Sequence, residues 1–213
     1  MIKPIIFLFA LLPFVASQAD EVAGDAWSIN PVLIGAKAPA FEAVSANGDM
    51  FHFDPENRTK PAVIIFYRGG WCPFCNLHWA ELRKIEGELR AMNVDMIFLS
   101  ADQPSMLTEA NEEEEKPGYY LLSDNHLEVA KKFGIAFHVN EAGVKKLLDH
   151  GHDIEAASGL DHHNLPTPAV FVVNSDGVIK FKFITPDYKV RLHNDVLLAA
   201  VKTMPEWRLR KPE

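Results

Sequence analysis

Apolar residues along this chain gather into short runs in some places and recur at helical spacing in others. The run 62–66, AVIIF, predicts a buried strand. From residue 73 to about 92, apolar side chains recur every three to five positions, which predicts one helix with a single buried face. The run 94–100, VDMIFLS, predicts a second strand. We expect it to lie parallel to the first, because a helix connects the two.

Beyond residue 100 the same alternation continues. Ser, Asp and Asn at 123–125 are residue types that cap a helix, and Asn-Ser-Asp-Gly at 174–177 predicts the turn of an antiparallel hairpin. The expected strands are 119–122, 169–173 and 178–184, and the expected helices are a polar one within 101–118, then 126–133, 141–148 and 191–204, the last with Val196, Leu197, Ala200 and Val201 on its buried face.

Three segments stand outside this alternation. Residues 20–30 are mixed in character and predict a loose arm. Around Asn47-Gly48, two short apolar segments that include Phe41 and Phe53 predict a β-hairpin. Within 135–164, the stretch HGHDIEAASGLDHHN predicts an insertion at the edge of the domain.

Strands that alternate with helices predict a doubly wound α/β domain with a central β-sheet flanked by helices. The N-terminal hairpin precedes this domain, and the His-rich insertion precedes its C-terminal hairpin. We expect one domain at 35–204, an arm at 20–34 and a tail at 205–213.

The first 19 residues have the pattern of a secretory signal. Lys3 precedes an apolar stretch, and the small residues Ser17 and Ala19 favour cleavage after Ala19. The apolar stretch is short for a membrane span, so an uncleaved anchor is the alternative. The sequence therefore predicts an exported protein, periplasmic or secreted, that meets a membrane only if the signal is retained.

Composition narrows the function classes. The 213 residues carry a formal net charge of −8 and show no basic patch or stripe, which argues against a nucleic-acid partner. The chain has two cysteines, Cys72 and Cys75, separated by two residues. A disulfide that closes so small a loop constrains the unfolded chain little, so the spacing favours a working redox pair over a structural bridge.

The position of the pair favours chemistry at the first thiol. Pro73 fits the first position of a helix, which places Cys72 at or near the N-cap. Free N–H groups and the helix dipole there stabilise a thiolate. Cys75 lies about one turn further on and is expected to be better covered. The alternatives are half of a zinc site, which lacks further cysteine ligands here, and an inert disulfide.

Four segments together resemble the thioredoxin superfamily, and within it the alkyl hydroperoxide reductase/thiol-specific antioxidant branch, also called redoxin or peroxiredoxin-like. The resemblance covers nearly all of the chain after residue 35 and implies a thioredoxin-like fold with a mixed sheet. The segments are GAKAPAF with the Asn-Gly-Asp hairpin, FYRGGWCPFC, DNHLEVAKKFGI and LPTPAVFVVNSDGVI.

The resemblance implies roles for individual residues. Cys72 looks like the attacking cysteine and Cys75 like its resolving partner, so the two would cycle between dithiol and disulfide. Pro168 looks like the cis-proline beside the active disulfide, with the Thr167 backbone offered to substrate; an ordinary proline at the start of a strand is the alternative. Trp71 looks like the tryptophan that precedes the pair in many thioredoxins.

Two departures from the family pattern bear on mechanism. Peroxiredoxins carry Thr or Ser three residues before the attacking cysteine and Pro four residues earlier, where this chain has Gly69 and Ile65. Thioredoxins bury an Asp six residues before the first cysteine, where this chain has Phe66.

Charged residues near the pair are further candidates. Arg68 could place a permanent cation beside the Cys72 thiolate, or it could be an exposed arginine at a strand end. Arg191 could reach the same pocket, and we expect it to bind substrate together with Trp71 and Phe74. His78 is a weaker candidate for proton transfer.

Three functions remain open at this stage. The first is an exported thiol–disulfide oxidoreductase and the second an exported thiol peroxidase. Both need a thiol reductant, thioredoxin-like or membrane-bound, and neither needs a cofactor. The third is a non-enzymatic metal-binding protein, although loop histidines that face solvent are the commoner outcome. Its candidate ligands are His150, His152, His162, His163, Asp153 and Asp161.

Overall fold

The computed structural model describes residues 21–107 and 118–204. The expected signal at 1–19, the expected tail at 205–213 and most of the helix expected within 101–118 lie outside these residues. Pro104–Met106 (η2) forms a single 3₁₀ turn just before the second gap. No helix in the described ranges is long and apolar enough to cross a membrane.

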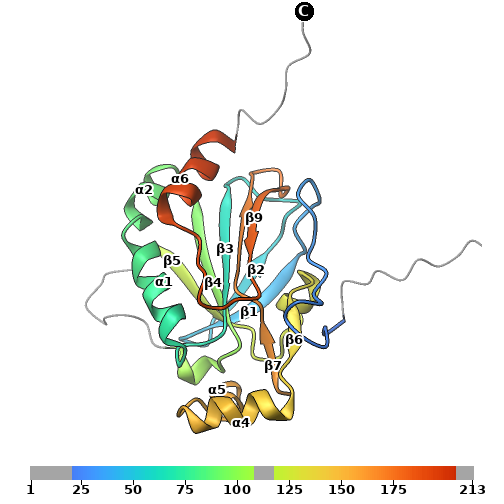
Figure 1. Cartoon of the computed structure of the whole chain (residues 1–213). Coiled ribbons are helices and arrows are strands. Elements are labelled where there is room, and N and C mark those ends of the chain that lie inside the picture. The colour runs from blue at the N-terminus through green and yellow to red at the C-terminus, as the bar shows by residue number, and fades with distance from the viewer. Residues whose placement is uncertain (1–20, 108–117, 205–213) are drawn as a thin grey trace, which may run out of the picture.

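A seven-stranded mixed sheet forms the centre of the molecule (Figure 1). Its order is β2-β1-β5-β4-β3-β8-β9, and β3, β4 and β5 are parallel neighbours, as the helical connection after the first strand predicts. The strands are β1 (Phe41–Ser45), β2 (Met50–Phe53), β3 (Ala62–Tyr67), β4 (Asp95–Ser100), β5 (Tyr119–Ser123), β8 (Ala169–Val173) and β9 (Ile179–Ile184).

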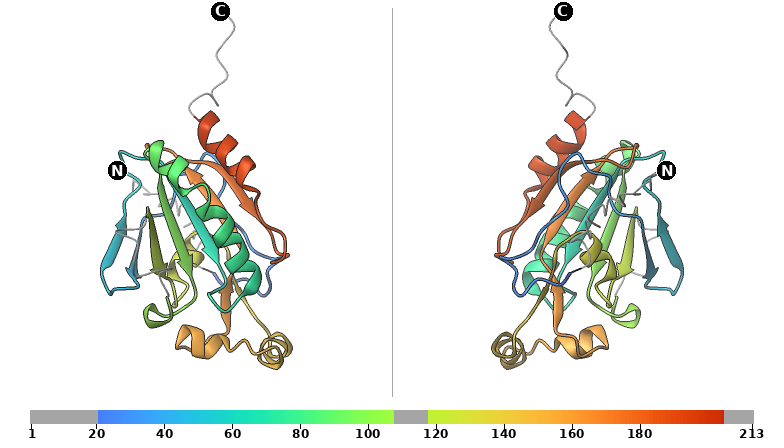
Figure 2. Two further views of the ribbon diagram at one scale, coloured as in Figure 1. Left: turned by 90° about the vertical axis from the view of Figure 1, so that its left-hand side faces the viewer. Right: turned by 90° about the vertical axis from the view of Figure 1, so that its right-hand side faces the viewer.

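Both faces of the sheet are covered, and each face has its own apolar core. On one face lie α1 (Pro73–Arg83), α2 (Glu86–Ala91) and α6 (Asn194–Thr203) (Figures 1 and 2). The other core includes α3 (Glu128–Lys132) and the hairpin of β1 and β2. Burial on both faces explains why β3 and β8 read as unbroken apolar runs.

The helix expected at 73–92 is two helices in the structure. The break falls at Lys84 and Ile85, whose backbone N–H groups donate to Glu81 and Leu82, three residues back, at 3.0 and 3.1 Å. This tightened turn shifts the register of the helix while Leu82, Ile85 and Leu89 all stay buried. The prediction of one continuous helix is therefore wrong at this turn.

The segment expected to be a loose arm is bound to the domain. The Ala23 N–H donates to Ala136 at 2.9 Å, and its carbonyl accepts from His138 at 2.8 Å. Val22, Ile29 and Val32 pack against the core beneath. The arm thus extends the small sheet made by β6 (Ala136–His138) and β7 (Asn164–Pro166), and the expectation of a loose segment is wrong.

Two further helical details differ from expectation. Val196, expected on the buried face of the last helix, is 48% exposed, whereas Leu198 beside it is buried. The His-rich insertion contains α5 (Ile154–Ser158) after α4 (Glu141–Asp149). Both short helices lie beyond the end of the sheet at which α1 begins (Figure 1).

Candidate active site

Cys72 occupies the turn between the central strand β3 and helix α1. It is the N-cap residue of α1, and Pro73 takes the first helical position, as predicted. The Cys72 N–H donates to the Gly69 carbonyl at 3.1 Å, which fixes the turn. Its carbonyl accepts from Cys75 and Asn76 in the first turn of the helix. The sulfur therefore sits where unpaired helical N–H groups stabilise negative charge.

The two thiols differ sharply in acidity. A hydrogen bond from the Cys75 thiol lowers the pKa of Cys72 to about 6, helped by the Cys75 backbone N–H and by the cations Arg68 and Arg191, against the effect of burial. The same hydrogen bond, with burial, raises the pKa of Cys75 far above its usual range. Both side chains are buried, so Cys75 is no better covered than Cys72. The acidity, rather than exposure, therefore favours Cys72 over Cys75 as a candidate nucleophile.

The two arginines hold different positions around the pair. Arg68 is 8% exposed, which excludes the reading of a surface arginine. Its guanidinium carbon lies 4.8 Å from the centre of the Trp71 ring and 4.5 Å from that of Tyr188. Arg191 instead reaches Cys75, with Nη2 at 3.4 Å from Sγ. The structure thus brings both predicted arginines to the site, one beside each thiol.

A pocket of about 390 Å³ opens beside Cys72 and Arg68. Most of its wall is apolar, and cationic or titratable groups come from α4 and the loop that follows it. The predicted substrate-binding residues Trp71 and Phe74 line it, whereas Arg191 does not. The other lining residues include Phe137, Val139, Leu147, Pro168, Pro186 and Tyr188, with Lys146, His150 and His152 among the polar ones.

Thr167 and Pro168 do not have the expected conformation. No peptide bond among the described residues is cis, so the prediction of a cis bond before Pro168 is wrong. The Thr167 N–H donates to Ile135 at 2.9 Å and continues the ladder between β6 and β7. Thr167 is fully buried and Pro168 contributes to the pocket wall. The Thr167 amide is therefore not free to pair with a client segment.

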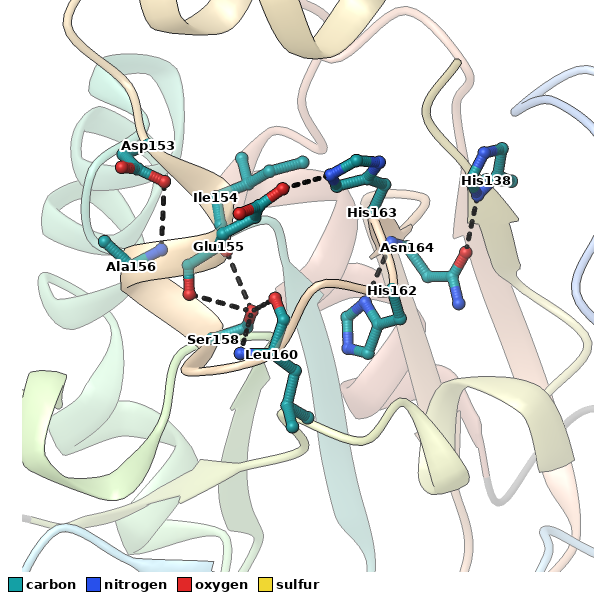
Figure 3. A network of polar contacts seen from close by, with 10 residues as sticks. All are labelled: His138, Asp153, Ile154, Glu155, Ala156, Ser158, Leu160, His162, His163 and Asn164. Atoms are coloured by element: carbon teal, nitrogen blue, oxygen red, sulfur yellow. Dashed lines mark hydrogen bonds and ion pairs between the residues drawn. The ribbon is translucent and has the colours of Figure 1, made fainter. Parts of the chain in front are cut away.

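The histidines of the insertion are engaged separately (Figure 3). His163 Nε2 contacts Glu155, and His162 Nε2 lies 2.7 Å from the Asn125 carbonyl. His150 Nδ1 contacts the Lys146 carbonyl at 2.7 Å. In the part of the chain that the structure describes, no three His, Cys, Asp or Glu side chains are placed to hold one metal ion. The arrangement does not favour the metal-binding alternative.

A family model for the AhpC/TSA family matches residues 34–182, most of the chain. The chain belongs to the AhpC/TSA family. Peroxiredoxin Bcp of Escherichia coli K12 is 27% identical over 174 residues, which cover 82% of this chain and 98% of that protein. The chain is thus a member of the peroxiredoxin-like branch of the thioredoxin superfamily, as its motifs indicate.

Solved structures show the same fold for this AhpC/TSA family member. Reduced 2-Cys peroxiredoxin of Plasmodium vivax matches with a TM-score of 0.60 and 15% identity, covering 83% of each chain. Peroxidoxin BcpB of Mycobacterium tuberculosis matches with a TM-score of 0.57 and 18% identity, covering 83% of this chain and 98% of that one. At these identities the likeness concerns the thioredoxin-like fold alone.

The two departures from the AhpC/TSA pattern have structural counterparts. Phe66 is buried among aromatic rings, with its centroid 5.1 Å from that of Phe133, so no acid stands at this position. Gly69 has φ of +153°, and a Cβ there would lie 2.3 Å from Trp71 Nε1 and 2.5 Å from Asp102 Oδ1. A side chain at position 69 therefore has no room.

Asp102 is the residue that sequence reasoning missed. It follows β4, is buried, and its Oδ2 accepts from the Gly70 N–H at 2.7 Å. Burial raises its pKa to about 6 against the Gly70 and Ser100 hydrogen bonds, and negative charge on Cys72 adds to the rise. The sequence could have placed Asp102 near the cysteines, because β3 and β4 are parallel neighbours and their carboxyl ends meet at one edge of the sheet. His78, by contrast, is half-buried, and its partial burial lowers its pKa to about 4, which leaves it neutral at pH 7.

Replacing Arg68 by methionine is expected to raise the pKa of Cys72 by about one pH unit, because a buried cation near a thiolate lowers the pKa of the thiol by roughly that amount. The rise is incomplete because Cys75 still donates its hydrogen bond. The dependence of the iodoacetamide alkylation rate on pH measures the pKa of Cys72. Arg68→Lys, which keeps the charge, is the matched control and should retain most of the acidity. Equal alkylation profiles in wild type and Arg68→Met would show that the cation has no influence.

Proposed function

We propose that this protein is an exported thiol peroxidase in which Cys72 attacks a hydroperoxide and Cys75 resolves the product. One observation carries the proposal. Cys72 is an N-cap thiol with its pKa lowered to about 6, beside a pocket and hydrogen-bonded by a second thiol that stays protonated. This combination supplies a thiolate nucleophile at neutral pH together with a resolving group one turn away.

The proposed reaction consists of two chemical steps, after which the disulfide is reduced. The Cys72 thiolate attacks one peroxide oxygen and the O–O bond breaks. An S–OH group forms, and the other oxygen takes up a proton and leaves as an alcohol or water. The Cys75 thiol then attacks the Cys72 sulfenic acid, which releases water and forms the Cys72–Cys75 disulfide. A dithiol reductant outside the chain, thioredoxin-like or membrane-bound, returns both thiols to the reduced state.

The neighbouring residues support this chemistry. Arg68, held between Trp71 and Tyr188, keeps positive charge beside the thiolate and the oxygen that becomes negative. Trp71, Phe74 and Pro168 line the pocket with apolar surface. That surface favours an organic hydroperoxide over hydrogen peroxide, since apolar contact adds binding energy.

Disulfide exchange with client proteins is the second candidate, and one observation weighs against it. The Thr167 N–H, which a client strand would use for β-type pairing, is already bonded to Ile135. The Cys72–Cys75 pair itself is compatible with either reaction.

Stopped-flow oxidation of the reduced protein tests the proposal. Cumene hydroperoxide is expected to oxidise Cys72 roughly tenfold faster than hydrogen peroxide, the gain that about 1.4 kcal/mol of additional apolar contact provides. In parallel, Cys75→Ser is incubated with disulfide-bearing proteins to trap mixed disulfides. Slow reaction with both peroxides, combined with efficient trapping, would show that the protein is a disulfide exchanger.

Export is supported by the pattern of residues 1–19. Intact-mass analysis of the protein recovered from the periplasm of an expressing bacterium tests it. A species that begins at Asp20 is the expected result, and a full-length species in the membrane fraction would indicate a retained anchor.

A further inference from the structure

Asp102 is tied to the same turn that carries Cys72. Its Oδ2 accepts from the Gly70 N–H at 2.7 Å and lies 3.2 Å from the Ser100 hydroxyl. The Cys72 N–H closes the turn onto Gly69 at 3.1 Å. Asp102 comes from the end of β4 and Cys72 from the start of α1, so two separate elements deliver a carboxyl and a thiol to one four-residue turn.

The second carboxyl oxygen of Asp102 has no partner. Oδ1 is buried and makes no hydrogen bond, although its carboxyl group is otherwise well held. A buried polar atom without a partner costs free energy, and such atoms recur where a site is prepared for catalysis. The Oδ1 atom therefore requires an explanation that packing does not give.

The position of Asp102 Oδ1 provides an explanation for its lack of a partner. A Cβ built on Gly69 would lie 2.3 Å from Trp71 Nε1 and 2.5 Å from Asp102 Oδ1. These two atoms thus occupy the space that the first atom of a residue-69 side chain would fill. A carboxyl oxygen is therefore present at this point of the turn, supplied by the segment that follows β4.

We propose that Asp102 is the catalytic acid–base group of the Cys72 site. This inference rests on the proposed peroxidase function and names the residue that moves its proton. In the resting site the Asp102 carboxylate accepts the proton of the Cys72 thiol. In the reaction the carboxylic acid returns that proton to the oxygen that leaves.

Written as a balance, Cys72–S⁻, ROOH and Asp102–COOH give Cys72–SOH, ROH and Asp102–COO⁻. The S–O bond forms as the O–O bond breaks, and the alkoxide takes the carboxyl proton. Sulfur is oxidised and the peroxide reduced, so no further reactant is needed. The pKa values of Cys72 and Asp102, both about 6, make transfer between them nearly balanced in either direction.

Few other groups that titrate near neutrality face this carboxyl. Tyr67 on β3 is buried with its pKa raised, so it stays neutral. Ser100 on β4 and the Gly70 N–H are neutral donors, and Ser123 on β5 donates to the Asp102 carbonyl rather than to its side chain. The Cys72 thiolate is the charged group that interacts with Asp102. His150 and His152 line the pocket, so the comparison with Asp102→Asn, rather than the wild-type profile alone, assigns a pH effect to the Asp102–Cys72 pair.

Asp102→Asn keeps the shape of the side chain and removes its proton transfer. Reduced wild type and variant are compared by stopped-flow with cumene hydroperoxide between pH 5 and 9, and by iodoacetamide alkylation over the same range. Wild type should react fastest near pH 6 and more slowly above it as the acid loses its proton. The variant should react about 100-fold more slowly at pH 6, without the alkaline decline. Alkylation needs no acid, and loss of the negative charge should leave it equal or faster.

The outcomes separate the two proposals. Slow peroxide reaction of wild type with normal alkylation would refute the peroxidase function itself. Fast wild-type reaction, matched by Asp102→Asn with the same alkaline decline, would overturn the role of Asp102. If Asp102→Asn does not fold, Ser100→Ala serves instead. It removes a hydrogen bond that lowers the pKa of Asp102, so the alkaline decline should move to higher pH, and an unmoved decline would overturn the role.

Discussion

Cys72→Ser is expected to abolish peroxide reduction, with a loss of at least about 10³-fold, because the remaining thiol, Cys75, has its pKa raised and stays protonated. Cys75→Ser should instead keep the first oxidation near the wild-type rate and stop turnover, since the sulfenic acid then lacks its internal partner. Peroxide consumption with a dithiol reductant measures turnover. Dimedone labelling followed by mass spectrometry measures the sulfenic acid.

The two variants control for each other because the exchanges are isosteric and only three positions apart. Dimedone should label Cys75→Ser strongly, wild type weakly and Cys72→Ser not at all. Removal of the Cys75 thiol also removes the hydrogen bond that lowers the pKa of Cys72, so a moderate slowing at pH 6 is part of the expectation. Dimedone labelling of Cys72→Ser but not of Cys75→Ser would reverse the assigned order.

Local sequence patterns were sufficient to predict most strands of the central sheet. The run at 62–66 became β3, the run at 94–100 became β4, and the parallel pairing between them followed from the helix that connects them. The Asn-Gly turn gave the hairpin of β1 and β2 with the expected ends. These elements are specified by residues near one another in the chain, which is why a single sequence sufficed.

Other features depend on contacts between distant segments. The arm is ordered because Ala23 adds to β6, more than a hundred residues away, and nothing in its own composition indicates that pairing. The break at Lys84 and Ile85 lets the apolar residues on both sides of it stay buried in one core. The conformation at Pro168 was inferred from a family motif, and here the bond of Thr167 to Ile135 continues the β6–β7 ladder instead.

The residues of the candidate site also divide into those that local patterns predict and those that depend on distant segments. Cys72 at the N-cap and Arg68 beside it lie within one short stretch, and both were predicted. Asp102, Tyr188 and His152 reach the same place from other elements, and only the tertiary structure brings them there. The sequence was therefore sufficient to predict the candidate nucleophile, whereas the fold supplies the groups that surround it.

Gly69→Ala is expected to destabilise the protein by about 2–5 kcal/mol and to slow oxidation of Cys72, although the change adds a single carbon. The new Cβ would meet Trp71 Nε1 and Asp102 Oδ1 at 2.3 and 2.5 Å, and the φ of +153° is one that side chains rarely adopt. Urea unfolding monitored by circular dichroism measures the loss of stability, and stopped-flow oxidation measures the rate.

Gly70→Ala is the matched control in the same turn. A Cβ at Gly70 meets only Asp102 Oδ2, at an ordinary 3.7 Å, and the N–H that donates to this oxygen is kept. The Gly70→Ala substitution should therefore lower the free energy of unfolding by less than about 1 kcal/mol. Gly69→Thr, which restores the residue type of related peroxiredoxins, should behave like Gly69→Ala or worse. A stable and faster Gly69→Thr variant would show that the turn can accept the hydroxyl. Loss of stability at position 69 but not at position 70 would mean that the space that a side chain at 69 needs is already filled by Trp71 and Asp102.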